Sequence, residues 1–305
     1  MKVLVTGVTG FIGTALSRDL SEAGHTVTGL SRDPAAAHQR APWLDQVFGW
    51  DAMAETVSTE ALSGMDAVIH LAGERIAIPL TTAKKRAVLE SRRAGTRHLV
   101  QGLSLATPRP RVLISASAVG YYGDHGDAEV VEETPPASHF LAQVCLAWEH
   151  EAAQARGPGL RVAVLRIGHV LGPGDGGLAP LFRLAKLGLG GPLGSGRQWW
   201  PWIHLADVIG LTRHILEGDV DGMFNATAPQ PVRQREFARI LGRVLHRPAF
   251  LPAPAFVLKL VLGEMASEVL LSRRAIPHRA QQVGYQFRFP ELEPALRDIL
   301  LSKAR

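Results

Sequence analysis

Apolar residues follow two different spacings along the first two-thirds of the chain. Short runs rich in apolar and branched residues predict strands over Lys2–Thr6, His25–Ser31, Val47–Trp50, Ala67–Leu71, Arg111–Ala116 and Arg161–Ile167. Apolar positions three and four residues apart predict helices over Phe11–Ala23, Thr81–Ala106 and Ser138–Arg156. Strands that alternate with helices indicate right-handed βαβ units and a mostly parallel sheet covered on both faces.

The pattern changes after Ile167. Gly168–Gly177 contains five glycines and one proline, which predicts a loop. Further helices are predicted over Leu178–Leu187 and Leu205–Leu216, a strand over Met223–Ala226, and a helix-rich region from 233 onward. The predicted fold class is therefore α/β: a Rossmann-type, doubly wound parallel sheet with a smaller, helix-rich C-terminal substrate lobe. Residues 1–167 and about 203–228 would form the sheet domain, and 168–202 and 229–305 the smaller lobe.

Composition narrows the class of protein. Hydrophobic residues at 46% and charged residues at 20% are typical of a globular protein, and no apolar run has the length of a membrane span. The single cysteine, Cys145, and the absence of a secretory signal favour the cytoplasm. The basic residues behind the net charge of +5 are scattered, so we expect no nucleic-acid partner. The lack of a spanning segment predicts no membrane partner, and we expect a small-molecule substrate and a monomer or homodimer. No Cys/His cluster has metal-ligand spacing, so no metal is expected.

A glycine motif directly follows the first predicted strand. Gly7, Gly10 and Gly13 form GxxGxxG at the start of a predicted helix. Glycine allows the tight turn and the close approach of backbone to a pyrophosphate, and the helix N-terminus offers free N–H donors to the phosphates. The motif predicts a dinucleotide site; a glycine-rich turn without a ligand is the alternative.

The end of the second predicted strand bears on the choice of dinucleotide. It reads Gly29-Leu-Ser-Arg-Asp33, and a basic side chain at this place accommodates the 2′-phosphate of NADP whereas an acidic one binds the ribose of NAD. Ser31 and Arg32 therefore favour NADP over NAD. Asp33 lies one place too late for the ribose, although a shift of one residue would reverse the assignment.

Together with the glycine loop, five further stretches of the chain resemble motifs of the extended short-chain dehydrogenase/reductases. Within that superfamily they resemble a divergent epimerase-like oxidoreductase subgroup that has a small C-terminal domain. They are His70–Glu74, Thr81–Thr96, Ser115–Gly123, Leu165–Gly172 and Pro201–Asp207. The resemblance covers nearly the whole chain and implies a nicotinamide cofactor. The cofactor-binding residues that we assign from the motifs and the resemblance are Gly7, Thr9, Gly10, Phe11, Ile12, Gly13, Ser31, Arg32, Leu71, Ala72, Gly73, Glu74 and Arg166.

The acid/base pair of that superfamily is missing. Its members use a tyrosine with a lysine four residues later, but alignment of the helix on Leu146–Glu149 places Leu141 and Cys145 there, and neither can do that work. The candidates for catalysis are Ser117, Tyr121 and Tyr122. The alternative for Ser117 is a polar strand-end residue, over which we favour a role in catalysis, and the alternative for the tyrosines is aromatic packing at the sheet edge. Glu74, with a pKa raised by a partly desolvated pocket, and Lys85 are weaker candidates, for which a surface ion pair is the alternative.

Two hypotheses follow from these residues. The first is an NADP-binding oxidoreductase that acts on a small carbonyl or hydroxyl substrate, with sugar-nucleotide-like substrates among the candidates, in the cleft between the sheet's carboxyl edge and the C-terminal lobe. Reduction and epimerisation are both compatible with it. The second is an NADP-binding sensor or scaffold that has lost turnover, because the tyrosine–lysine pair is replaced.

Overall fold

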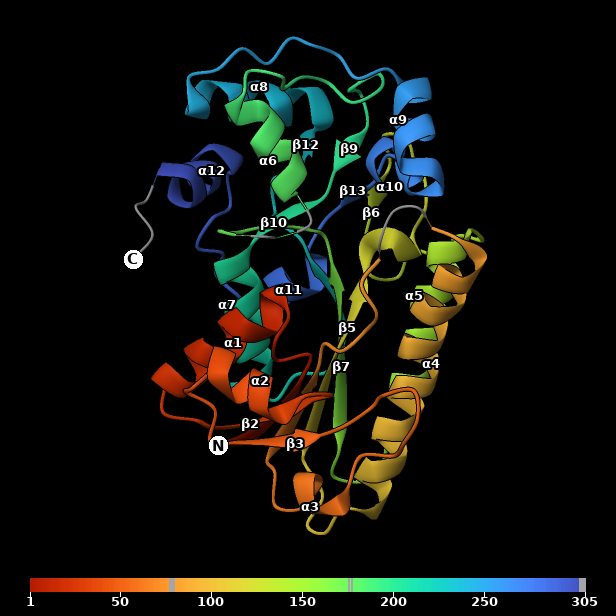
Figure 1. Ribbon diagram of the computed structural model, residues 1–305, viewed down its shortest axis with the longest axis vertical. Coiled ribbons are helices and arrows are strands. Elements are labelled where there is room, and N and C mark those ends of the chain that lie inside the picture. Colours follow the sequence, from red (N-terminus) through yellow and green to blue (C-terminus); the bar gives the residue numbers. More distant parts are fainter. Residues whose placement is uncertain (77–79, 175, 177, 302–305) are drawn as a thin grey trace.

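A seven-stranded parallel sheet forms the centre of the molecule (Figure 1), in a computed structural model that describes residues 1–76, 80–174, 176 and 178–301. The strand order is β11-β7-β5-β4-β1-β2-β3. These strands are β1 (Lys2–Thr6), β2 (Thr26–Ser31), β3 (Gln46–Gly49), β4 (Ala67–His70), β5 (Val112–Ala118), β7 (Arg161–Ile167) and β11 (Gly222–Ala226). The order reverses direction between β1 and β4, the place where doubly wound sheets bind ligands.

Helices cover both faces of the sheet. Figure 1 shows α1, α2 and α7 along one side and α4 and α5 along the other. The helices of the sheet domain are α1 (Phe11–Glu22), α2 (Pro34–Arg40), α3 (Thr59–Leu62), α4 (Thr82–Leu105), the 3-10 turn η1 (Val119–Tyr121), α5 (Phe140–Ala153) and α7 (Leu205–Glu217). None of the described helices is long and apolar enough to cross a bilayer.

The remaining elements belong mostly to the region around α8. They are β6 (Glu129–Val130), β8 (His169–Leu171), α6 (Ala179–Lys186), β9 (Trp199–Trp200), β10 (Trp202–His204), β12 (Val232–Arg233), α8 (Gln234–Leu245), α9 (Ala255–Leu262), η2 (Gly263–Met265), α10 (Ala266–Leu270), β13 (Arg274–Ala275), α11 (His278–Gln282) and α12 (Leu292–Leu301). Three two-stranded ladders, β10–β8, β12–β9 and β13–β6, connect parts of this region to one another and to the loop after β5.

Alternation along the strands divides the core between the two faces. Val3 and Val5 of β1 join a cluster that includes residues of α1 and α7, whereas Leu4 between them joins a cluster with residues of α3 and α4. All three side chains are fully buried. A strand buried on both faces has no polar alternation, which is why its sequence is continuously apolar.

A third core cluster lies outside the sheet. It contains Trp200 and Trp202 together with side chains of α6, α8 and α12. Both indole rings are buried, so these tryptophans are packing residues of this cluster. The cluster draws mainly on the two ranges predicted for the smaller lobe, a division that stays a prediction.

The sequence predicted the main sheet correctly and one loop wrongly. The fold class is confirmed, and the seven strands of the main sheet begin and end within two residues of the predicted ranges, whereas the short strands outside it were not predicted. Gly168–Gly177, predicted as a loop, contains the short strand β8, which pairs in parallel with β10. A cross-strand partner 33 residues away sets this pairing, and the local glycine content cannot reveal it. Residues 175 and 177 of that prediction lie outside the described residues.

Candidate functional site

The glycine loop has a geometry that only glycine permits. Gly7 has φ +68°, the left-handed region, and a Cβ there would lie 2.9 Å from the carbonyl carbon of Leu71. A Cβ on Gly13 would lie 2.2 Å from the carbonyl oxygen of Gly7, far inside van der Waals contact. Gly13 therefore lets α1 pack tightly on the end of β1, and Gly7 lets the loop after β4 approach the turn.

The N-terminus of α1 is left open toward this loop. Gly10 is the N-cap residue, no side chain caps the helix, and its first turn holds no acidic residue. The ring of Phe11 turns away and packs against Gly172 and Gly176. The backbone N–H groups of the first turn thus carry the positive end of the helix dipole, and no side chain of the described residues caps them.

A cavity of about 480 Å³ opens beside the glycine loop. Its lining includes nine of the residues predicted to bind the cofactor: Gly7, Thr9, Gly10, Ser31, Arg32, Leu71, Ala72, Gly73 and Glu74. Phe11, Ile12, Gly13 and Arg166, which were also predicted, are not among the lining residues. Gly13 supports the loop from behind, and Arg166 is buried beneath the sheet edge.

Two arginines line the part of the cavity nearest β2. Arg32 follows the strand, and Arg40 at the end of α2 lines the same cavity. The Asp33 carboxylate is the N-cap of α2 and accepts a hydrogen bond from the Ala36 backbone N–H at 2.9 Å. The sequence analysis missed Arg40. This residue follows the second strand by several positions, and nothing in the sequence indicates that the end of α2 lies at the cavity.

The loop after β4 is fixed to the glycine loop by a buried histidine. The backbone N–H groups of Leu71 and Ala72 donate to Thr6 Oγ1, so the Thr6 hydroxyl donates to His70 Nδ1 at 2.8 Å. His70 Nε2 then donates to Thr96 Oγ1 at 3.0 Å. Burial, followed by the nearby Arg92 charge, lowers the pKa of His70 to about 3, so this ring stays neutral and structural.

The pKa of the Glu74 carboxyl is lowered, whereas the sequence analysis expected it to be raised. Its carboxylate accepts a hydrogen bond from Lys84 Nζ at 2.5 Å, and this bond is the main reason that its pKa lies below the usual range. The expectation of a raised pKa was wrong, because a lysine one turn into α4 outweighs the partial burial. Lys85 also has a partner: it forms an ion pair with Glu264 at 2.6 Å.

Ser117 and Tyr122 belong to a buried network centred on Arg166. The Ser117 hydroxyl donates to Glu149 at 2.7 Å, and the Arg166 guanidinium binds both oxygens of the same carboxylate. Arg166 also donates to the Tyr122 hydroxyl, which donates to Asn225 at 2.6 Å. Burial raises the pKa of Tyr122 above its ordinary value. The network joins β5, α5, β7 and β11 at the carboxyl edge of the sheet.

Tyr121 differs from these two candidates. Its ring lies under the Arg166 guanidinium, 3.5 Å from ring centroid to the guanidinium carbon, and meets the Tyr122 ring edge-on. Its side chain is only partly buried, and none of the described residues forms a hydrogen bond with its hydroxyl. Of the three predicted catalytic side chains, Tyr121 is therefore the one whose hydroxyl is available to a ligand.

The face of α5 that would carry the usual acid/base pair is apolar. Leu141 and Cys145 are both buried, and burial raises the pKa of the Cys145 thiol to about 11. The thiol donates weakly to the Ala118 carbonyl at 3.6 Å. Cys145 therefore packs as a small apolar residue.

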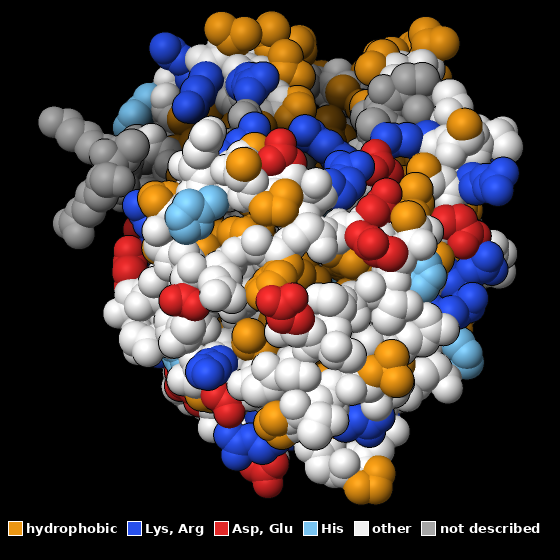
Figure 2. All heavy atoms as spheres, turned by 60° about the horizontal axis from the view of Figure 1, so that its bottom comes forward, with side chains coloured by type: hydrophobic (Ala, Val, Ile, Leu, Met, Phe, Trp, Pro, Cys, Tyr) orange, Lys and Arg blue, Asp and Glu red, His pale blue; other side chains and the backbone are white. Residues whose placement is uncertain are grey.

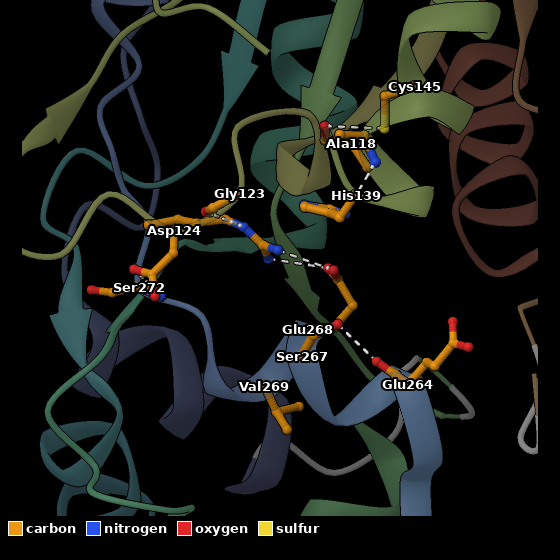
Figure 3. A network of polar contacts seen from close by, with 12 residues as sticks. Ala118, Gly123, Asp124, His139, Cys145, Glu264, Ser267, Glu268, Val269 and Ser272 are labelled. Carbon is orange, nitrogen blue, oxygen red and sulfur yellow. Dashed lines mark hydrogen bonds and ion pairs between the residues drawn. The ribbon is translucent and has the colours of Figure 1, made fainter. Parts of the chain in front are cut away.

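A polar group from the C-terminal segment approaches that face (Figure 3). Glu268 of α10 forms a bidentate ion pair with the buried Arg273, whose Nε donates to the Gly123 carbonyl at 3.0 Å. A Cβ atom added to Gly120 would lie 3.7 Å from Glu268 Oε2, 3.8 Å from Leu141 Cβ and 4.0 Å from Cys145 Sγ, so Glu268 lies close to this face of α5. Sequence reasoning did not find this carboxylate, because Glu268 lies more than 110 residues beyond the end of α5 in the sequence.

Two histidines with unpartnered ring nitrogens flank this ion pair. His139 Nδ1 accepts from the Ala142 backbone N–H, which places the proton on Nε2, and that atom is buried without a partner. His169 Nε2 is buried without a partner too, and burial lowers its pKa to about 4. Both rings experience the charges of Glu268 and Arg273. Neutral hydrogen-bonding groups thus converge where the sheet edge meets α10.

One group of potential metal ligands occurs elsewhere among the described residues. Glu132, Glu133 and His278 place one ligand atom each within 4.8 Å of one another. Glu132 Oε1, however, accepts hydrogen bonds from the backbone of Asn225 and Arg279, so it already has a structural role. The sequence has no Cys/His spacing that predicts this cluster, and we propose no metal site there.

Two sequence profiles of known protein families match parts of the chain. Residues 3–226 match the sequence profile of the NAD dependent epimerase/dehydratase family. The chain belongs to this family. Residues 253–299 match a separate profile, a domain of unknown function designated DUF1731. The resemblance inferred from the sequence, an extended short-chain dehydrogenase/reductase with a small C-terminal domain, is confirmed.

Relatives extend over the whole length of this family member. The epimerase family protein SDR39U1 homolog, chloroplastic, of Arabidopsis thaliana is 40% identical over 304 residues, 98% of this chain and 87% of the relative. A crystal structure of human epimerase family protein SDR39U1 (isoform 2) with NADPH has a TM-score of 0.89 and 37% identity, and it covers 99% of this chain and 100% of that one. The nucleoside-diphosphate sugar epimerase of Corynebacterium glutamicum has a TM-score of 0.78 and 32% identity, with 98% of this chain and 58% of that one covered.

Proposed function

We propose that the protein is an NADP(H)-dependent oxidoreductase that acts on a small carbonyl or hydroxyl substrate. The observation that carries this proposal is the open N-terminus of α1 behind a glycine turn, with Arg32 and Arg40 lining the same cavity. A dinucleotide would place its pyrophosphate on the free amides and its 2′-phosphate between the two guanidinium groups. The SDR39U1 relative that was crystallised with NADPH supports this choice.

The residues of the cavity fit such a cofactor. No Cβ can be added at Gly7 or Gly13 without a backbone clash, which keeps the loop bare for a phosphate. Asp33, the acidic residue nearest the expected ribose position, is occupied as the α2 N-cap. When bound, the nicotinamide ring supplies hydride chemistry, and the protein orients it and the substrate.

The substrate site is proposed at the junction of η1, the start of α5 and α10. Tyr121 offers a free hydroxyl there as a proton donor, while Ser117 and Tyr122, predicted alongside it, act from the network that positions the edge of the sheet. His139 and His169 each present a ring nitrogen without a protein partner. Because Arg273 is already neutralised by Glu268, this end suits an uncharged carbonyl or hydroxyl group better than a carboxylate or phosphate.

Cofactor choice is tested by titrating NADPH and NADH into wild type, Arg32→Ala, Arg40→Ala and the control Arg93→Ala, whose exposed side chain lies outside the cavity. We expect tighter NADPH binding in wild type and in the control. Loss of one bidentate phosphate contact should weaken NADPH by roughly 10-fold or more and leave NADH nearly unchanged. Equal affinity of wild type for both dinucleotides would contradict the assignment.

Turnover is tested by NADPH oxidation over a panel of aldehydes and ketones. Tyr121→Phe should lose most of the activity and retain NADPH affinity, because only the hydroxyl is removed. Tyr122→Phe should instead lower stability, since that hydroxyl has two buried partners. A wild-type protein that binds NADPH stoichiometrically and oxidises it with no member of the panel would favour the sensor hypothesis.

A further inference from the structure

Exposed hydrophobic side chains gather at the end of the molecule that carries α6, α8 and α9, uppermost in Figure 1. We call this surface the apolar cap, and it consists of Leu187, Leu189, Phe250, Phe256, Leu260 and Val261. These side chains are between 52% and 84% exposed. Figure 2 shows hydrophobic side chains along its upper edge with Lys and Arg side chains just below them. Apolar surface gathered in this way marks an interaction site in a folded protein.

Contacts between two segments that are distant in the sequence hold parts of the cap together. The backbone N–H of Leu251 donates to the Gly190 carbonyl, and Arg247 Nε donates to the Lys186 carbonyl at 3.0 Å. Leu193 and Ala253 are joined by a parallel bridge. The segment from 186 to 193 therefore lies beside the segment from 247 to 253, and α9 begins directly after the second one.

The helix α9 is apolar but only partly covered: four of its residues, Ala255, Val257, Leu258 and Leu262, are half-buried and the rest are exposed. Seven of its eight residues, AFVLKLVL, are apolar, and none of them is buried. A helix that is apolar all round is normally enclosed by protein or lipid. Its length is far below that of a membrane-spanning helix, so an interface is the environment that suits it.

Positive side chains predominate around the cap, where Arg239 and Arg243 are paired with Glu236 and Glu293. The stretches 178–196 and 237–263, which form it, contain no Asp or Glu and six Lys or Arg: Arg183, Lys186, Arg239, Arg243, Arg247 and Lys259. Lys186, Arg247 and Lys259 are exposed, and no acidic group of the described residues forms an ion pair with them. Glu264, just beyond α9, is paired with Lys85.

We propose that the apolar cap binds the surface of an anionic lipid membrane, with α9 lying in the interface and Lys186, Arg247 and Lys259 on the lipid phosphates. A second copy of the chain fits less well, because a twofold contact through this surface would bring like charges together. The expectation of no membrane partner came from the absence of a spanning segment, which an interfacial helix does not require. The proposal is independent of the proposed reaction.

Co-sedimentation with lipid vesicles tests the proposal. Full-length protein is mixed with phosphatidylcholine vesicles and with vesicles in which about a third of the lipid is phosphatidylglycerol. We expect binding to the anionic vesicles that falls as salt rises. Phe256→Ser/Leu260→Ser and Lys186→Glu/Lys259→Glu should each weaken it by at least about tenfold. Circular dichroism confirms that the variants are folded.

Two control variants match these changes at distant exposed positions. Leu105→Ser removes an apolar side chain that is 64% exposed at the end of α4, and Arg93→Glu reverses a charge on the same helix. Both should bind vesicles as wild type does. Absence of wild-type binding to anionic vesicles, equal binding to both vesicle types, or controls that weaken binding as much as the cap variants would overturn the proposal. So would a dimer in sedimentation velocity that Phe256→Ser/Leu260→Ser dissociates.

Discussion

Replacing Arg166 by methionine distinguishes two possible roles of this side chain. The sequence analysis predicted that Arg166 binds the cofactor, whereas its contacts indicate that it supports the edge of the sheet. Arg166 is 3% exposed and donates four hydrogen bonds: two to Glu149, one to Tyr122 and one to the Glu132 carbonyl. Methionine fills much of its volume but leaves the buried Glu149 carboxylate with only the Ser117 hydroxyl. Breaking such a pair from one side costs about 3–5 kcal/mol.

The assay is urea unfolding followed by tryptophan fluorescence, with NADPH affinity measured on the folded protein. We expect Arg166→Met and Glu149→Met each to lower the free energy of unfolding by about 3–5 kcal/mol. The double variant should lose less than the sum of the two, because no buried charge is left unpaired. Arg93→Met, which breaks an exposed pair with Glu90, should cost at most about 1 kcal/mol. An Arg166→Met protein with wild-type stability and NADPH affinity reduced tenfold or more would refute the structural role.

Three further predictions follow from single residues. Gly13→Ala should abolish dinucleotide binding and destabilise the fold, because its Cβ would lie 2.2 Å from a backbone oxygen, whereas Gly157→Ala, with nothing within 4 Å, should leave thermal stability and binding as they are. Cys145 should react with iodoacetamide at pH 8 on the order of 200-fold more slowly in the folded protein than in urea, since a pKa of about 11 leaves little thiolate; comparable rates would show an accessible thiolate. The folded pKa of His70 lies near 3 and the unfolded one near 6.5, so unfolding takes up a proton as the pH falls below 6.5 and the stability should drop by roughly 2–3 kcal/mol by about pH 4.5. His70→Gln should flatten that part of the urea-midpoint curve, and an unchanged slope would assign the acid sensitivity to other groups.

The sheet could be predicted because its strands carry local signals. A strand buried on both faces, such as β1, has an uninterrupted apolar run at its centre (Val3, Leu4 and Val5), and a glycine turn marks its end. The short strand β8 carries no such signal, since glycine surrounds it and its partner β10 lies far along the chain. Pairing of this kind depends on tertiary structure, which a single sequence does not display.

The candidate site, like the sheet, could be predicted where it depends on local sequence and not where it depends on tertiary packing. Gly7, Gly10 and Arg32 line the cavity as expected, because backbone geometry and charge at a strand end are local properties. Arg40 and Glu268 reach their places through the path of α2 and the packing of α10, and no spacing in the sequence encodes either. Glu74 shows the same limit for electrostatics, because the sign of its pKa shift depends on the rotamer of Lys84.

The central claim is that the glycine turn and the start of α1 hold the pyrophosphate of NADPH while Arg32 and Arg40 hold its 2′-phosphate. A crystal structure of the complex with NADPH measures this directly. We predict phosphate oxygens within hydrogen-bond distance of the first-turn amides of α1, and the 2′-phosphate in contact with at least one of the two guanidinium groups. A cofactor bound elsewhere, or a 2′-phosphate directed into solvent, would contradict the account.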